Sequence, residues 1–423
     1  MKKMFLDATL MIVFCGLAAS AQVTEQVGYE FCSINGCLDG GTPTAPLISD
    51  GHGNLYGTTQ SFGAGLPSAG TVFELSPDGK GAWTETVLYS FCSVTDCIDG
   101  NEPLAGLVFD KAGKLYGTTV YGGTYENGTV FELSPGRDGS WTEQVLHSFS
   151  LTNQDGNYPH QGLILDAHGN LYGTCQVGGA FLYGTVFELS PGSDGEWTET
   201  ILYNFGQLPD GEYPSSGVQM DATGRLYGVT GYGGAYNYGT VFALAHTAKG
   251  WEEKILHSFN PNTQDGIYPN GDLILDAAGS LFGTTPLGGA SGYGTVFEVT
   301  PQAVGNSPEV VLHSFNKTTT DGTNPEAGLI FDSQGNLYGT TVYGVVGSNC
   351  NGYGCGTVFR LKPNNHGGWT ESVLYTFKSN GVDGQFPYAG LMFDGNMGLV
   401  GTTAFGGSGA HGLGGGTMFE IKP

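Results

Sequence analysis

The residues with the most varied chemistry stand directly after a repeated proline. The motif Asp-Gly-x-x-Pro occurs seven times, and the residues that follow its proline are Thr44, Leu104, His160, Ser215, Asn270, Glu326 and Tyr388. A histidine and a glutamate at this position could perform acid–base catalysis. Asp272 is the most unusual departure, because it replaces a residue that is usually glycine. Seven unlike residues are also typical of a rim that tolerates substitution, so His160, Asp272 and Glu326 are weak catalytic candidates.

The aspartates of the same motif form a second candidate site. They are Asp39, Asp99, Asp155, Asp210, Asp265, Asp321 and Asp383. A ring of carboxylates could bind Ca²⁺, which takes oxygen ligands. In the alternative interpretation, Asp-Gly makes a turn and the proline fixes the start of the next strand. Sevenfold repetition favours this structural role, because a scaffold needs identical copies and a binding site seldom does. We expect no cofactor, with calcium as a weak alternative.

Aromatic residues recur in a set of glycine-rich loops, at Phe62, Tyr121, Tyr232, Tyr343 and Phe405. Aromatic faces beside small polar groups suit a sugar ring, although packing between repeats is the alternative for each of them. These loops are longest in the sixth, seventh and first repeats, and proteins concentrate recognition in loops held on a rigid scaffold. The predicted contacts in these three repeats are Phe62, Tyr343, Tyr353, Phe405 and His411. Neutral drift in loop length is the alternative explanation.

Six cysteines form three C-x4-C pairs, Cys32/Cys37, Cys92/Cys97 and Cys350/Cys355. In an oxidising compartment, the simplest interpretation is three local disulfides. Zinc binding is less favoured, because zinc sites of this kind bring a second close pair or nearby histidines. Cys175 replaces a threonine of its repeat and is expected to be a small buried residue with a free thiol.

The N-terminus is typical of an exported protein. Residues 1–21 combine Lys2 and Lys3 with an apolar run and an Ala-Ser-Ala cleavage pattern, so the mature chain is expected to begin at Gln22. Lipidation at Cys15 is disfavoured, because the large residue Phe14 precedes it. No other stretch is apolar and long enough to span a bilayer. We therefore expect a secreted protein, extracellular or periplasmic.

The composition excludes several classes of partner. The net charge of −25 arises from 39 acidic and 14 basic side chains, so a polyanion would be repelled over most of the surface. Nucleic acid and anionic lipid are poor partners, whereas a cation, a neutral glycan or another protein is compatible. We expect the protein to be a monomer.

One repeat accounts for nearly the whole chain, and it predicts the fold. Copies of L-Y-G-T-T, with small variations such as Cys175, Val229, Phe282 and Val400, begin at Leu55, Leu115, Leu171, Leu226, Leu281, Leu337 and Leu399. Each repeat holds four short strand signals separated by turn residues; in the second they are Gly106–Asp110, Leu115–Thr119, Thr129–Leu133 and Trp141–Phe149. Seven four-stranded antiparallel units predict an all-β, seven-bladed β-propeller. His147, His257 and His313 take a fourth-strand position that elsewhere holds tyrosine, and they are interpreted as packing residues rather than as metal ligands.

The two ends of the chain are offset from the repeat. Residues 23–31 match only the fourth strand of the repeat, and Ala389–Ile421 matches the first three strands without a fourth. We predict that residues 23–31 complete the last blade and close the ring, since closure removes exposed sheet edges. Residues 22–423 would then form a single domain.

The repeated segments D-G-x-x-P, D-x-x-G-N-L-Y-G-T-T and G-T-V-F-E-L-S-P resemble the GloVer (Gloeo/Verruco) tandem repeat of exported bacterial proteins. The resemblance extends over nearly all of residues 23–421. It implies a repeat fold and export, and it leaves the activity open.

Function is predicted only in outline. No G-x-S-x-G, H-E-x-x-H or phosphate-loop motif occurs in the sequence, so common hydrolase and nucleotide-binding classes lack support. The sequence favours a binding or interaction module for a glycan or a cell-surface protein, and not an enzyme. The alternative is a carbohydrate-active propeller enzyme, a glycoside hydrolase or a polysaccharide lyase. The convergence of His160, Asp272 and Glu326 in one pocket would favour that alternative.

Overall fold

The computed structural model describes residues 24–65, 68–151, 155–193, 195–302, 307–317, 321–344, 350–395, 397–408 and 414–422. The predicted signal peptide at residues 1–21 and the predicted contact His411 lie outside these residues. In the described part, all regular structure is β-strand except the short 3-10 helix η1 (Thr95–Cys97). None of its helices is long and apolar enough to cross a membrane.

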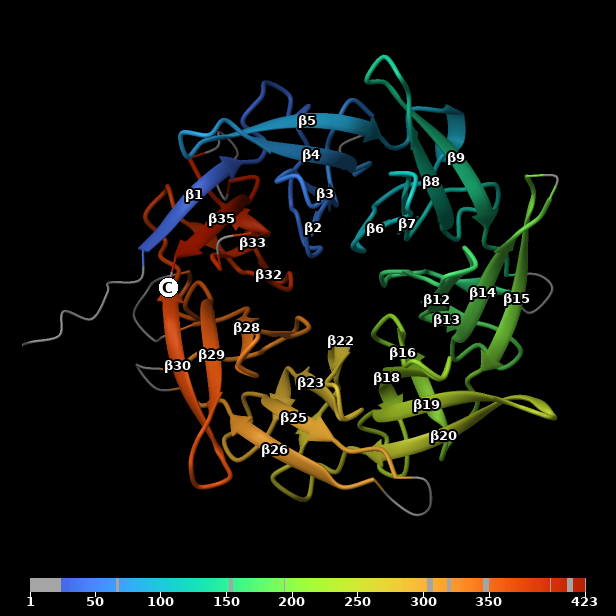
Figure 1. Cartoon of the computed structure of the whole chain (residues 1–423), viewed down its shortest axis with the longest axis vertical. Helices are drawn as coiled ribbons and strands as arrows, with labels where there is room; N and C mark the ends of the chain where they lie inside the picture. The colour runs from blue at the N-terminus through green and yellow to red at the C-terminus, as the bar shows by residue number, and fades with distance from the viewer. Residues whose placement is uncertain are drawn as a thin grey trace, which may run out of the picture.

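Seven antiparallel sheets stand in a ring, each with its first strand toward the centre and its fourth strand at the outside (Figure 1). The predicted seven-bladed β-propeller is therefore confirmed. Blade 1 contains β2 (Ile48–Ser49), β3 (Leu55–Thr59), β4 (Thr71–Pro77) and β5 (Trp83–Ser90). Blade 2 contains β6 (Val108–Phe109), β7 (Leu115–Thr119), β8 (Thr129–Pro135) and β9 (Trp141–Ser148). Blade 3 contains β11 (Ile164–Leu165), β12 (Leu171–Cys175), β14 (Thr185–Pro191) and β15 (Trp197–Asn204).

The remaining blades follow the same order. Blade 4 contains β17 (Gln219–Met220), β18 (Leu226–Gly233), β19 (Thr240–Thr247) and β20 (Gly250–Ser258), with β16 (Gly211–Pro214) also paired to β18. Blade 5 contains β22 (Asn270–Leu275), β23 (Leu281–Thr285), β25 (Thr295–Val299) and β26 (Glu309–Ser314). Blade 6 contains β27 (Ile330–Phe331), β28 (Leu337–Thr341), β29 (Thr357–Pro363) and β30 (Trp369–Thr376). Blade 7 contains β32 (Met392–Phe393), β33 (Leu399–Thr403), β35 (Thr417–Lys422) and the N-terminal β1 (Thr24–Glu30).

Three two-stranded ladders connect the segment after Asp-Gly to the loop after the second strand. They pair β10 (Gly156–Asn157) with β13 (Val177–Gly178), β21 (Gly266–Ile267) with β24 (Leu287–Gly288), and β31 (Gly384–Gln385) with β34 (Phe405–Gly406). These ladders lie where two connections of the same blade meet, so they hold the loops of one face together.

The second strand explains the L-Y-G-T-T sequence. All five positions are buried in β3 and in its counterparts, and a Cβ on Gly57 would lie 2.6 Å from the ring of Phe73. The first threonine donates its hydroxyl to a carbonyl of the next blade, as in Thr58 to Ala105 at 3.0 Å. The second threonine bonds the threonine that begins the third strand, as in Thr59 and Thr71 at 2.8 Å. The repeated residues therefore bind blades to one another as well as strands.

The first strand is shorter than predicted. The sequence predicts Gly106–Asp110, whereas β6 covers only Val108–Phe109. Just before the predicted strand, the carbonyl of Ala105 is bound by Thr58 of the neighbouring blade, so the chain is tied to that blade where the predicted strand begins. This part of the first segment lines the central pocket, and in blade 5 it also pairs within its own sheet, where Asn270 stands opposite Thr284.

The apolar core lies between blades. A phenylalanine after each fourth strand packs on the phenylalanine of the next blade's third strand, with ring centroids 4.9 to 5.2 Å apart. All of these rings are fully or almost fully buried. Each Phe–Phe pair adds an aromatic contact to the apolar area that it removes from water. The boundaries between blades are therefore the main packed interfaces of the ring.

The chain ends close the ring as predicted. Strand β1 pairs antiparallel with β35, from Thr24 opposite Lys422 to Glu30 opposite Thr417, and the two lie side by side in Figure 1. Phe31 then packs on Phe73 of blade 1. The predicted completion of the last blade by residues 23–31 is confirmed over Thr24–Glu30, and it leaves β35 covered by a fourth strand.

Candidate functional site

A central pocket of about 670 Å³ opens where the first segments of all seven blades meet. Its lining includes six of the seven residues that follow the repeated prolines, namely Thr44, Leu104, His160, Asn270, Glu326 and Tyr388. The pocket therefore gathers the positions at which the repeats differ most. We call this region the channel mouth.

The three weak catalytic candidates, His160, Asp272 and Glu326, all line this pocket. Burial lowers the pKa of the His160 imidazole and raises the pKa of the Glu326 carboxyl. Burial also raises the pKa of Asp272, against the opposing effect of the backbone N–H of Gly217. Burial, Tyr343 and Glu326 together raise the pKa of Tyr388 to about 12. Each shift favours the uncharged form of its group.

Asp272 occupies a boundary that lacks one of the repeated bonds. The first threonine of L-Y-G-T-T is replaced by Val229 in blade 4, so this position cannot donate a hydroxyl to blade 5. At the same boundary, the N–H of Gly217 in blade 4 donates to Asp272 Oδ1 of blade 5 at 2.8 Å. The two departures from the repeat thus coincide, and the aspartate supplies a cross-blade bond in place of the threonine.

Sequence reasoning missed a strained position just before each proline. These seven residues, none of them glycine, have φ between 56° and 59°: Thr42, Glu102, Tyr158, Tyr213, Tyr268, Asn324 and Phe386. Their N–H groups donate to the preceding blade, as in Tyr213 to Tyr183 at 2.8 Å and Tyr268 to Tyr238 at 2.9 Å. Among these seven residues, Asn324 gave the one indication of this conformation in the sequence, because asparagine tolerates the left-handed region better than most residues. We call these residues the left-handed positions.

Two chains of four or more neighbouring aromatic rings lie beside the channel mouth, in addition to the shorter series Tyr121, Tyr158 and His160, whose centroids are 5.3 and 6.4 Å apart. In blades 3 to 5, ring centroids are 5.0 to 5.9 Å apart along the series Tyr183, Tyr213, Tyr232, Tyr268 and Tyr238. In blades 6 and 7, centroids are 5.8 to 6.1 Å apart along Tyr353, Tyr343, Phe386 and Phe405. The tyrosines at left-handed positions link the first chain, and Phe386 links the second.

The structure brings three of the predicted contacts together. Tyr343, Tyr353 and Phe405 belong to the second aromatic chain, and Phe405 also lines the central pocket. Phe62 is half-buried in the corresponding loop of blade 1, where its ring lies against Gly41. The aromatic chain of blades 3 to 5 was not predicted, because loop length does not reveal it. Its central residue, Tyr232, is 47% exposed.

The repeated aspartates lie at the blade boundaries, and none of them lines the central pocket. Six are buried and Asp210 is half-buried. Each bonds the tyrosine or histidine of the preceding fourth strand at 2.8 to 3.3 Å: Tyr29 with Asp39, Tyr89 with Asp99, His147 with Asp155, Tyr203 with Asp210, His257 with Asp265, His313 with Asp321 and Tyr375 with Asp383. The histidines also pack edge-on against phenylalanine, as His257 does on Phe259. Packing and hydrogen bonding thus combine at this position.

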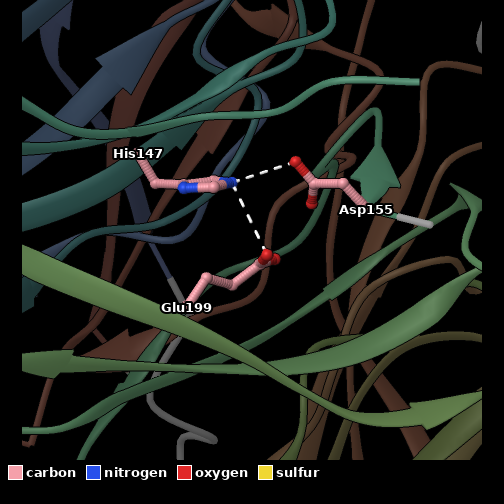
Figure 2. Close-up of side chains that lie close together, drawn as sticks. All are labelled: His147, Asp155 and Glu199. Atoms are coloured by element: carbon pink, nitrogen blue, oxygen red, sulfur yellow. Dashed lines mark hydrogen bonds and ion pairs between the residues drawn. The ribbon is translucent and has the colours of Figure 1, made fainter. Parts of the chain in front are cut away.

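A glutamate from the next blade completes each of these sets. Given in the order of the aspartates above, from Asp39 to Asp383, the glutamates are Glu85, Glu143, Glu199, Glu253, Glu309, Glu371 and Glu25. Burial and the neighbouring aspartate raise the glutamate pKa to about 7 to about 9. We call each set of tyrosine or histidine, aspartate and glutamate a boundary triad; Figure 2 shows the one formed by His147, Asp155 and Glu199.

The six paired cysteines form the three predicted local disulfides, Cys32–Cys37, Cys92–Cys97 and Cys350–Cys355. Cys175 is buried with a free thiol, and burial raises the pKa of that thiol. The third disulfide lies in the long loop of blade 6, shortly before β29 and beside the second aromatic chain.

Comparison with known proteins finds distant likenesses among solved structures. No curated protein matches the sequence. A "putative 6-phosphogluconolactonase" from Bacteroides uniformis aligns at 14% identity and a TM-score of 0.47, covering 78% of this chain and 83% of its own. A "putative oxidoreductase (glucose dehydrogenase)" from Thermus thermophilus aligns at 17% identity and a TM-score of 0.41, covering 76% and 96%. Neither likeness is close enough to inform function.

The family assignment comes from the repeat itself. The model of the Gloeobacter/Verrucomicrobia repeat matches residues 18–165, 70–276 and 247–423, which together extend over nearly the entire chain. These matches contain the seven L-Y-G-T-T copies and the Asp-Gly-x-x-Pro motifs that build the blade boundaries. The chain belongs to the Gloeobacter/Verrucomicrobia repeat family.

Proposed function

We propose that the protein is an exported propeller that binds a neutral glycan at the channel mouth. The observation that carries the proposal is the central pocket, which brings polar side chains of several blades together with Phe405 and Tyr388. The chain has a net charge of −25, yet burial moves the pKa of His160, Asp272 and Glu326 toward their uncharged forms. The lining also includes Thr44, Asn270 and Tyr388, whose polar side chains recognise hydroxyl groups by hydrogen bonds without requiring an ionic partner.

The aromatic chains supply the second element that a sugar ligand needs. Sugar rings pack their C–H faces on aromatic rings, while their hydroxyl groups bond nearby polar side chains. Phe405 and Tyr388 line the pocket, and the second aromatic chain continues outward through Phe386 and Tyr343 to the exposed Tyr353. An oligosaccharide could therefore extend from the pocket along this chain.

A carbohydrate-active enzyme is the second candidate, because His160, Asp272 and Glu326 line one pocket. Hydrolysis by two carboxyl groups requires that one is protonated while the other is ionised. Asp272, however, accepts the N–H of Gly217 at 2.8 Å in a bond between blades. This structural role of one of the two carboxyl groups is the reason for ranking binding above hydrolysis.

The experiment is a screen of the secreted protein against neutral and acidic polysaccharides, read by affinity electrophoresis and then by calorimetry with oligosaccharides. We expect binding to a neutral glycan and weakening of at least tenfold in Tyr343→Ala and Phe405→Ala. Tyr121→Ala and Tyr232→Ala are the matched controls in blades 2 and 4, and they should weaken binding less. Equal losses on both sides, or losses confined to the second and fourth blades, would place the site elsewhere.

The enzyme alternative has its own readout. Release of reducing ends or of unsaturated products by the wild-type protein, lost in Glu326→Gln and Asp272→Asn, would establish catalysis and overturn the binding proposal. Binding without product release supports it. Absence of binding to any glycan in the screen contradicts the proposed ligand class.

A further inference from the structure

Three of the seven boundary triads carry histidine in place of tyrosine. They are His147–Asp155–Glu199, His257–Asp265–Glu309 and His313–Asp321–Glu371, and in each the three potential ligand atoms lie within 4.8 Å of one another. The histidine is on the fourth strand of one blade, the aspartate on the connection that follows, and the glutamate on the fourth strand of the next blade. Figure 2 shows the first triad, in which His147 Nε2 faces both carboxylates.

The distances suit a single metal ion. His147 Nε2 lies 3.2 Å from Asp155 Oδ2 and 3.8 Å from Glu199 Oε2. His257 Nε2 lies 2.8 Å from Asp265 Oδ2. Zinc binds imidazole nitrogen and carboxylate oxygen at about 2.0 to 2.2 Å, so two ligands of one zinc ion lie roughly 3 to 4 Å apart. A small adjustment of side chains would bring the triad to that geometry.

The carboxylates of the second triad have unused acceptor capacity. The side chain of Asp265 is only 6% exposed, and its Oδ1 has no hydrogen-bond partner. Glu309 Oε1 is likewise buried and without a partner. In the described residues, no lysine or arginine forms an ion pair with either carboxylate. Asp265 Oδ2 already bonds the Asn260 N–H and His257, but a buried carboxylate oxygen without a donor is costly, and a cation beside the triad would compensate the two unpartnered oxygens.

Access to the second triad is open. His257, Asp265 and Glu309 line a surface pocket of about 690 Å³, together with polar residues such as Ser258 and Thr263. Water can therefore enter and complete the coordination of an ion, as in zinc sites with three protein ligands. This combination of buried ligands and an open side distinguishes the second triad.

We propose that His257, Asp265 and Glu309 form a binding site for a divalent transition-metal ion such as Zn²⁺, and that the other two histidine triads repeat it. One imidazole and two carboxylates favour a first-row transition metal, because calcium and magnesium prefer oxygen ligands alone. The two negative charges of the carboxylates balance the charge of the ion. The site binds blade 4 to blade 5 through the metal, so it would strengthen the boundary.

The four tyrosine triads provide an internal comparison. Tyr203, Asp210 and Glu253 form the same arrangement with a phenol, and Tyr203 donates its hydroxyl to Asp210 at 3.0 Å. Glu253 Oε1 also lacks a partner. The two triads differ in the group on the fourth strand, which is a phenol or an imidazole, and in Asp210 Oδ1, which accepts the N–H of Gly211 at 2.7 Å. Exchange of tyrosine and histidine at these positions therefore tests the metal site with residues that the fold already accepts.

The test uses the full secreted chain without an affinity tag, stripped of metal with EDTA. Zn²⁺ is titrated by calorimetry, and Co²⁺ is titrated by its visible absorption, which reports coordination geometry. We expect three ions per chain, two in His257→Tyr, and at least a tenfold loss of affinity when His147, His257 and His313 are all changed to tyrosine. Tyr203→His should add a fourth ion. Ca²⁺ should bind far more weakly than Zn²⁺.

Folding of each variant is checked by its thermal melt in EDTA, where the histidine and tyrosine forms should differ by only a few degrees. Glu309→Gln offers a second route to the same conclusion, because it removes one ligand charge without changing the histidine. Zn²⁺ should raise the melting temperature of the wild type and not that of the triple variant. The absence of Zn²⁺ binding, or an unchanged number of ions in the triple variant, overturns the proposal.

Discussion

At the blade boundaries the same residue types recur seven times, whereas the channel mouth has a different residue at nearly every blade. The boundaries repeat a Phe–Phe pair and a triad around a buried aspartate. The mouth presents threonine, leucine, histidine, asparagine, glutamate and tyrosine at one position of the repeat. The difference teaches that one motif can supply both parts: its aspartate holds the ring together, and the residue after its proline is free to vary.

The boundaries also differ from the mouth in what raises the pKa of their carboxyl groups. Each boundary triad puts two carboxyl groups in one partly buried place, and the glutamate responds with a raised pKa, as in Glu85 beside Asp39. In the described residues of the mouth, the pKa values of Asp272 and Glu326 are raised by burial alone. Changes at the boundaries should therefore alter stability and its pH dependence, and changes at the mouth should alter binding.

The largest expected effect is loss of ring closure. Deleting residues 22–31 removes β1, exposes the edge of β35 and leaves Phe73 without Phe31. A buried Phe→Ala change alone costs about 3 to 5 kcal/mol, so we expect the deletion to reduce the free energy of unfolding by more than that. Thermal unfolding followed by circular dichroism measures the effect. A chain that begins at Gln22 is the control, and an unchanged melting temperature in the deletion would contradict closure by β1.

A single boundary aspartate should have the next largest effect. Asp99 accepts hydrogen bonds from the Tyr89 hydroxyl and from the backbone and side chain of Ser93, all at 2.8 to 2.9 Å. Asp99→Ala leaves these donors unpaired, and we expect a loss of about 3 kcal/mol in urea unfolding. Glu326→Gln at the channel mouth is the matched control and should cost less than about 1 kcal/mol. Similar losses of unfolding free energy in both variants would contradict the view that the boundaries determine stability and the channel mouth does not.

The glutamates of the triads predict how stability changes with pH. Burial and Asp39 raise the pKa of Glu85 to about 8 from its ordinary value of 4.5. The folded state therefore holds a proton that the unfolded state releases between these values, so this stabilisation is complete below pH 4.5 and is lost as the pH rises through about 8. We expect the melting temperature to fall between about pH 6 and about pH 9 by several degrees.

Glu85→Gln isolates the contribution of this carboxyl, because glutamine resembles the protonated glutamate and does not titrate. The variant should match the wild type at about pH 5 and be more stable at about pH 8.5. A wild-type melting temperature that rises over the same interval, or a variant that follows the wild type at every pH, contradicts a raised pKa at Glu85.

The sequence predicted the ring but not the chemistry of its boundaries. The number of blades, the disulfides and the closure by residues 23–31 follow from the repeat, because each depends on residues close together in the chain or on the register of its ends. The boundary triads join residues from different repeats, such as Tyr89 and Glu143, and only the closed ring brings them together. The short first strand was missed for the same reason, since the carbonyl of Ala105, just before the predicted strand, is bound by the neighbouring blade.

The candidate site was predicted in part. The repeated proline identified His160 and Glu326, and the departure from glycine identified Asp272, all of which line the pocket. The tyrosine chain of blades 3 to 5 depends on the left-handed positions, where a backbone conformation turns Tyr213 and Tyr268 toward Tyr232. No residue type at these positions requires that conformation, so a single sequence could not reveal it.

The smallest expected effect tests the left-handed positions, which join the boundaries to the mouth. Thr42 has φ of 59° and Asn324 has φ of 58°, although a β-branched residue is far less suited to this region than asparagine. Both are held by two backbone bonds; the N–H of Thr42 donates to Gly415 at 2.7 Å, and its carbonyl accepts from Gln60 at 3.1 Å.

Because the left-handed conformation costs an ordinary residue about 1 to 2 kcal/mol, Thr42→Asn should raise the free energy of unfolding by about 0.5 to 1 kcal/mol. Asn324→Thr should lower it by a similar amount, because its N–H and carbonyl make the equivalent bonds to Tyr293 and Val342. Urea unfolding of the two variants and of the double variant measures these changes. If the two variants change the free energy of unfolding in opposite directions, and the changes nearly cancel in the double variant, the strain arises from the backbone conformation at these positions. Changes of the same sign would show that the side chains at the channel mouth, and not the backbone, determine the effect.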